Sequence, residues 1–142
     1  MVTINPNDAI LGATVEGLDL SQPLAPGDFR AVLGALGQYG VLRIPNQSIG
    51  APELKKFAAA FGTLEINVAN NFQEPGHPEV MILSNMKRDG KPIGLSDAGQ
   101  DWHTDMSYSA DRVRQRAVWH HDSAPRRLTV GRHRVRQHVR RL

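Results

Sequence analysis

One short stretch of the 142-residue sequence holds side chains at a spacing that suits metal chemistry. His103 and Asp105 stand two residues apart in the run DWHTDMSY. On an extended strand, residues i and i+2 point to the same side, so this imidazole and this carboxylate can face one cation. A nitrogen and an oxygen ligand form two-thirds of the 2-His-1-carboxylate set that binds non-haem iron(II) and leaves positions open for substrate and dioxygen. The spacing therefore indicates part of an iron site.

The pair taken alone is weak evidence for a metal. About 0.4 such His-x-Asp pairs are expected by chance in a chain with this many histidines and aspartates. The alternative is a hydrogen bond between His103 and Asp105 at the protein surface, which needs no ion. The sequence around the pair has to decide between the two interpretations.

A helix and a strand are predicted in the first third of the chain. Asp28 follows Pro26-Gly27 and is a candidate N-cap. The spacing i, i+3, i+4 and i+7 predicts one apolar face of a helix, formed by Phe29, Val32, Leu33 and Leu36. Gly37 and Gly40 bracket its end, and residues 41–44 predict a short strand that Pro45 stops.

Further elements are predicted before residue 100. A second helix starts near Pro52 and ends at Gly62, with one apolar face formed by Leu54, Phe57 and Phe61. Residues 80–83, VMIL, predict a buried strand, and Asp89-Gly90 predicts a turn. The sequence before residue 110 therefore predicts a body that mixes helices and strands.

The net charge of +3 hides two segments of opposite character. Residues 1–110 carry seven Lys and Arg against twelve Asp and Glu, whereas residues 111–142 carry ten Arg against two Asp. We therefore expect a boundary near residue 110, and a tail that is disordered because its scattered apolar residues cannot offset the entropy of ordering. The absence of cysteine excludes disulfides, thiolate zinc sites and cysteine nucleophiles. With no apolar run of membrane-spanning length and no signal-like start, we expect a cytoplasmic protein without a membrane partner.

Five segments follow one another along the first 110 residues: GATVEGLDLSQPL, VLRIPNQSI, KKFAAAFGTLE, GKPIGLS and AGQDWHTDMSY. In order and spacing they resemble the TauD/TfdA family of 2-oxoglutarate-dependent dioxygenases, and the resemblance covers most of residues 8–109. The resemblance implies an α+β, mainly β fold, namely the N-terminal part of a double-stranded β-helix (jelly roll) with flanking helices. It also implies an oxidoreductase that uses Fe(II), 2-oxoglutarate and dioxygen to hydroxylate a small organic substrate.

The resemblance assigns site residues one by one. His103 and Asp105 match the family's first pair of iron ligands. Asn67 and Asn70 stand where relatives place substrate-contacting side chains, and Gly99 stands where the taurine enzymes have a substrate-binding Asn, so a taurine-like sulfonate is not the expected substrate. A further substrate position is Tyr108, for which plain core packing is the alternative, as it is for Trp102.

The resemblance also implies that the iron site is incomplete. In the family, the second iron histidine and the arginine that binds 2-oxoglutarate lie far downstream, beyond position 142. Four further histidines lie in sequence unlike the family's, and we do not expect them to substitute: His120, His121, His133 and His138. We expect a frameshift near residue 110 and an inactive, truncated product.

Two other functions stay open at this point. The ten arginines of residues 111–142 would bind nucleic acid through its phosphates, an interaction that needs no sequence specificity. Alternatively, the chain is an inactive structural fragment that pairs with a full-length relative.

Overall fold

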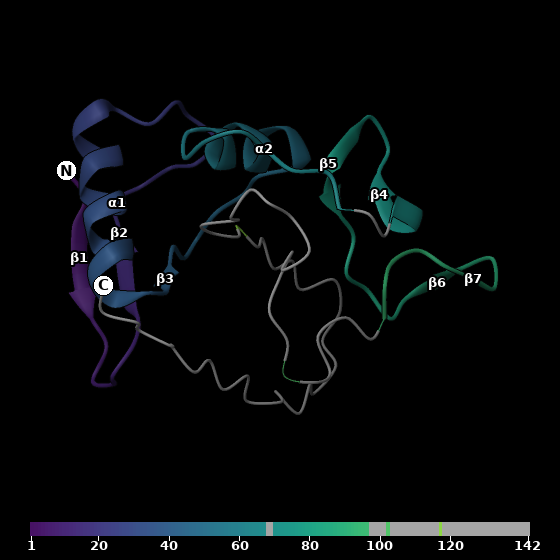
Figure 1. The fold of residues 1–142 in the computed structure, drawn as a ribbon, viewed down its shortest axis with the longest axis horizontal. Helices are drawn as coiled ribbons and strands as arrows, with labels where there is room; N and C mark the ends of the chain where they lie inside the picture. Colours follow the sequence, from purple (N-terminus) through teal and green to yellow (C-terminus); the bar gives the residue numbers. More distant parts are fainter. Residues whose placement is uncertain (68–69, 97–101, 103–116, 118–142) are drawn as a thin grey trace.

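The computed structural model describes residues 1–67, 70–96, 102 and 117 (Figure 1). The first group of elements consists of β1 (Thr3–Pro6), β2 (Ala13–Glu16), α1 (Pro26–Tyr39) and β3 (Leu42–Arg43). The second consists of α2 (Ala51–Ala59), the 3-10 turn η1 (Asn70–Phe72), β4 (Gln73–Glu74), β5 (His77–Met81), β6 (Lys87–Arg88) and β7 (Lys91–Pro92). Figure 1 shows the first group on one side, the strands β4 to β7 on the other, and α2 between them.

The first group is a three-stranded sheet with a helix packed on it. The strand order is β1-β2-β3, with β1 antiparallel to β2 and β2 parallel to β3. The parallel pair requires a crossover connection, which α1 provides. Ala13 and Val15 alternate with the half-buried Thr14 along β2 and are both 0% exposed, so this strand directs one face into the core.

Helix α1 begins earlier than the sequence predicts. Its N-cap is Ala25, which makes no side-chain capping bond, and Asp28 lies within the first turn. The prediction of Asp28 as the N-cap is therefore wrong, because Pro26 is already set to helical φ and its missing N–H is one that the first helical turn would leave unpaired. The predicted end is confirmed: Gly40 adopts a φ of 73° and donates its N–H to the Leu36 carbonyl at 2.9 Å.

Fewer apolar residues of α1 are buried than their spacing along the helix predicts. Val32 and Ala35 are buried, whereas Leu33 is 46% exposed. Phe29 and Leu36, the other two predicted core positions, are half-buried. Among the described strands, α1 packs mainly on β2 and β3, so only one narrow side of the helix is buried.

Helix α2 lies where Pro52 predicts it, but it ends before Gly62. Glu53 caps its start: the carboxylate Oε2 accepts the Gly50 N–H at 2.9 Å. Phe61 lies beyond the last helical residue and packs edge to face against Phe57 and Phe29, with ring centroids 5.3 and 5.2 Å apart. The aromatic residues therefore join the two helices, although no side chain of α2 is buried.

The predicted strand at residues 80–83 is displaced and is not buried. Strand β5 begins at His77 and ends at Met81, and Leu83 lies outside it with 51% of its surface exposed. The main described partners of β5 are the two-residue β4 on one edge, α2 and the short η1, so its apolar residues stay half-exposed. The predicted turn is confirmed: Asp89 and Gly90 adopt φ values of 51° and 76° between β6 and β7.

None of the helices in the described part of the chain is long and apolar enough to cross a membrane.

Candidate functional site

The residues predicted to bind iron lie outside the described part of the chain. This holds for His103 and Asp105, and also for the predicted substrate residues Gly99 and Tyr108. Trp102, next to His103 in the sequence, is described and is 72% exposed, so it is not the core residue that the alternative interpretation allowed. The structure places only Asn67 and Asn70 among the predicted site residues.

Asn67 and Asn70 both lie on the connection between α2 and β4. Asn67 is half-buried in an irregular segment after Gly62, and Asn70 is the first residue of η1. The end of η1 is tied to β5, because the N–H of Ile82 donates to the Phe72 carbonyl at 2.8 Å. The C-terminal end of the connection is therefore fixed by a hydrogen bond from the residue directly after β5.

An ion pair joins the two elements that flank this connection. Lys55 Nζ of α2 lies 2.7 Å from Glu79 Oε1 of β5. The hydrogen bond from Lys55 and that from the backbone lower the pKa of Glu79, and the charge of His77 acts in the same direction. The pair closes a loop over residues 56–78, which contains both Asn67 and Asn70.

Sequence reasoning missed a second His and carboxylate at alternating positions. His77 and Glu79 lie on one face of β5, and each keeps one buried polar atom without a hydrogen-bond partner: Nδ1 of His77 and Oε2 of Glu79. The His-Pro-Glu spacing is the signal that could have drawn attention to them. Among the described residues, they belong to no group of three or more side chains that could hold a metal ion.

The expected ligand types still fit the expected metal. An imidazole nitrogen and a carboxylate oxygen are the donors of the non-haem iron(II) site, and His103 and Asp105 supply one of each. Among the described residues, no group of three or more His, Asp or Glu side chains is placed to hold a metal ion.

Comparisons with known proteins identify the family. The model of the "Taurine catabolism dioxygenase TauD, TfdA family" matches residues 4–121. Pentalenolactone F synthase of Streptomyces arenae is 31% identical over 102 residues, which are 70% of this chain and 34% of that protein. The (S)-phenoxypropionate/alpha-ketoglutarate-dioxygenase of Delftia acidovorans is 31% identical over 116 residues, 74% of this chain and 37% of that protein. The chain thus spans little more than a third of the length of these two relatives.

A solved structure supports the same assignment. A Burkholderia xenovorans protein described as an alpha-ketoglutarate-dependent taurine dioxygenase superposes with a TM-score of 0.54 and 27% identity, over 62% of this chain and 32% of that one. The described part of the present chain, with one mixed three-stranded sheet, two antiparallel strand pairs and two α-helices, agrees with such a neighbour. The family resemblance seen in the sequence is confirmed: the chain belongs to the TauD, TfdA family of dioxygenases.

Proposed function

We propose that this chain supplies the first part of an Fe(II)- and 2-oxoglutarate-dependent dioxygenase domain that hydroxylates a small organic substrate. The observation that carries the proposal is the family match over residues 4–121, which includes the His103-x-Asp105 pair. The names of two relatives, from Delftia acidovorans and from Cupriavidus pinatubonensis, both specify alpha-ketoglutarate dependence.

In this proposal His103 and Asp105 hold the iron. His103 binds as the neutral imidazole and Asp105 as the ionised carboxylate, so iron affinity falls as the pH falls. Bound iron(II), together with 2-oxoglutarate, supplies the activation of dioxygen for hydroxylation. The contribution of these two side chains is to fix the ion while leaving other coordination positions open.

Asn67, Asn70, Gly99 and Tyr108 are the proposed substrate positions. The named substrates of the Delftia and Cupriavidus relatives, phenoxypropionate and 2,4-dichlorophenoxyacetate, are aryloxy carboxylic acids. An amide N–H₂ can donate hydrogen bonds to a carboxylate, and both Asn67 and Asn70 carry one. We therefore propose a small organic acid, rather than a sulfonate, as the substrate class.

The finer features of the fold belong to the same proposal. Residues 1–110 form the start of a jelly roll with flanking helices, and residues 111–142 form a separate, Arg-rich segment. By the family resemblance, the second iron histidine and the arginine for 2-oxoglutarate lie downstream of the segment that this chain matches. On this basis the 142 residues bind iron weakly and do not turn over 2-oxoglutarate by themselves.

Anaerobic titration with Fe(II) tests the ligand assignment. The protein should carry Gln at the four tail histidines, His120, His121, His133 and His138, so that they do not compete for the ion. In this background, we expect His103→Ala and Asp105→Ala each to weaken iron binding by roughly tenfold or more. The control His77→Ala, on β5, should bind as the parent does. Equal iron affinity in the parent and in His103→Ala would overturn the assignment.

A further inference from the structure

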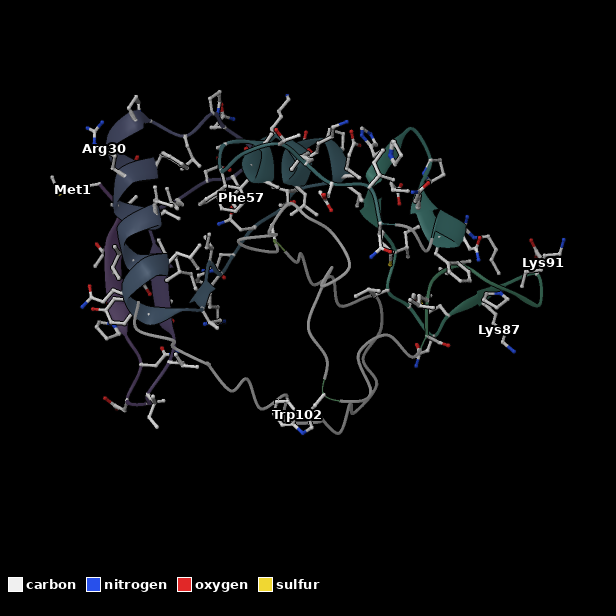
Figure 2. The ribbon with its side chains drawn as sticks, in the orientation of Figure 1. Met1, Arg30, Phe57, Lys87, Lys91 and Trp102 are labelled. Carbon is white, nitrogen blue, oxygen red and sulfur yellow. The ribbon has the colours of Figure 1, made fainter. Side chains whose placement is uncertain are left out.

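An exposed turn between β6 and β7 carries a residue pair that can react with itself. Asp89 and Gly90 form this turn and adopt φ values of 51° and 76°, the left-handed conformation of a two-residue hairpin connection. Residues 87–92 are all exposed. Figure 2 shows Lys87 and Lys91, one on each strand, at the end of the molecule far from Arg30. The turn is therefore open to water on the outside of the fold.

The reacting groups of the turn are not engaged elsewhere. In the part of the chain that the structure describes, no residue forms a hydrogen bond or an ion pair with the Asp89 carboxylate. Among the same residues, no backbone carbonyl accepts the Gly90 N–H. A Cβ built at Gly90 would meet no atom within 4 Å, so the space around this residue is empty of protein. Both the carboxyl group and the amide nitrogen are free to react.

We propose that Asp89 is a site of spontaneous isomerisation to isoaspartate. The Gly90 nitrogen attacks Cγ of the protonated Asp89 carboxyl group, and the N–H proton and the carboxyl hydroxyl leave together as water. The product is a succinimide ring, in which the nitrogen is bonded both to Cγ and to the Asp89 backbone carbonyl carbon. Water then breaks one of these two bonds. Cleavage of the new bond restores aspartate, whereas cleavage of the original peptide bond leaves the main chain running through Cβ and Cγ. One water is released and one is consumed, so the reaction needs no oxidant, reductant or enzyme.

The size of the hairpin allows the ring to close. The nitrogen reaches Cγ only if the Asp89 backbone rotates out of its turn conformation. Strands β6 and β7 are two residues long and pair with each other over two residue pairs, so they oppose this rotation weakly. Gly90 has no side chain to shield its nitrogen and is the most freely rotating residue type. The other described aspartates precede residues with side chains and are internal controls, namely Asp8, Asp19 and Asp28.

Peptide mapping of the aged protein tests the proposal. The intact protein and a synthetic peptide of residues 85–95 are incubated for several weeks at neutral pH, and both are digested with endoproteinase Asp-N. This protease cleaves before aspartate but not before isoaspartate. We expect the cut before Asp89 to decline in both samples, and the cuts before the three control aspartates to persist in the protein. Hydroxylamine, which attacks succinimides, should cleave the incubated protein between residues 89 and 90.

Two variants separate the chemistry from general loosening of the hairpin. Asp89→Glu should stop the reaction, because the longer side chain would have to close a larger and less favourable ring. Gly90→Ala strains the turn at its left-handed φ, yet it should slow isomerisation several-fold because the methyl group hinders the attack. The proposal is overturned if the peptide isomerises and the folded protein does not, or if Gly90→Ala reacts as fast as the parent.

The modification should also change the hairpin itself. Isoaspartate adds one carbon to the main chain within the turn, so the pairing of β6 with β7 is lost. Amide hydrogen exchange of residues 87–92 should therefore accelerate as isoaspartate accumulates. Exchange of residues 13–49, which contain all the buried apolar side chains of the described part, should stay the same. Faster exchange in both regions would show that the whole fold had opened, and would contradict a reaction confined to the turn.

Discussion

Lys55 and Glu79, 24 residues apart along the chain, form an ion pair whose Nζ and Oε1 atoms lie 2.7 Å apart. The pair connects the middle of α2 to the middle of β5, and the predicted substrate residues Asn67 and Asn70 lie on the connection between these elements. The conformation of this part of the candidate site therefore depends on a contact that neither asparagine makes.

The ion pair predicts a pH dependence of stability. The hydrogen bond from Lys55 holds the pKa of Glu79 below its ordinary value of 4.5, so the folded state binds a proton less readily than the unfolded state. The stabilisation is therefore present above pH 4.5 and is lost as the pH falls through the lowered pKa. We expect Glu79→Gln to weaken hydrogen-exchange protection in β5 at neutral pH and to reduce the loss of protection on acidification. If the parent and variant lose protection over the same pH range and to the same extent, the ion pair is not responsible.

Gln47 is predicted to stabilise the loops that cover the first sheet. Its Oε1 accepts the Leu20 N–H at 2.8 Å, and its Nε2 donates to the carbonyls of Leu18 and Pro45, each at 2.9 Å. Gln47→Ala leaves these part-buried backbone groups without partners, which costs about 1–3 kcal/mol. Hydrogen exchange of residues 13–49 measures the loss, and Gln38→Ala on the exposed side of α1 should have almost no effect.

Two neighbouring residues of α1 should respond very differently to truncation. Val32 is 1% exposed, and Val32→Ala should cost about 2 kcal/mol because it removes buried apolar surface and leaves a cavity. Leu33 is 46% exposed, so Leu33→Ala should cost well under half as much. Hydrogen-exchange protection factors of α1, measured in the two variants, compare their losses of stability. An equal loss in both variants would show that α1 is rotated from its described orientation.

A glycine within α1 and the glycine directly after it have opposite predicted effects on substitution. A Cβ at Gly34 would meet no atom within 4 Å, so Gly34→Ala should stabilise the helix by about 0.5–1 kcal/mol. At Gly40 the φ of 73° is left-handed, so Gly40→Ala should destabilise it by about 1–2 kcal/mol. Far-ultraviolet circular dichroism against temperature distinguishes the two, and stabilisation by both would contradict the described helix end.

The coding DNA supplies a prediction of another kind. If a frameshift near residue 110 produced the Arg-rich segment, a neighbouring frame should encode a continuation like that of the family. This continuation should contain a downstream histidine and arginine suited to iron and 2-oxoglutarate. Sequencing from the codon of Asp101 onward reads it directly, and the absence of such a continuation in every frame would refute the frameshift.

Local signals predicted the two helices and the turn at residues 89–90, but not the strands β1, β2 and β4. Pro26, Gly40 and Pro52 each determine the backbone conformation over about one helical turn. For this reason they predicted both ends of α1 and the start of α2 to within a few residues. Asp89-Gly90 placed the β6–β7 turn for the same reason, since both residues favour positive φ.

Burial was predicted less well, because it depends on partners distant in the sequence. Leu33 has the spacing of a core residue, yet no described element covers it. Residues 80–83 have the composition of a buried strand, but β4 pairs with β5 over two residues only. The Lys55–Glu79 pair could not be foreseen, because nothing in the sequence specifies which lysine and which glutamate become neighbours. The iron and substrate assignments of residues 99–108 stay predictions.

Among the described residues, every buried apolar side chain lies between residues 13 and 49. This distribution has a consequence for protein synthesis. The ribosome releases the chain from its N-terminus at about 5–20 residues per second, and N-terminal units fold first. The sheet β1-β2-β3 and α1 can therefore close while α2 to β7 are still leaving the ribosome. During that interval the nascent chain presents a finished sheet-and-helix unit followed by apolar elements that have not yet been covered. A chaperone that binds short apolar segments should therefore engage residues 51–96 and pass over the residues before them.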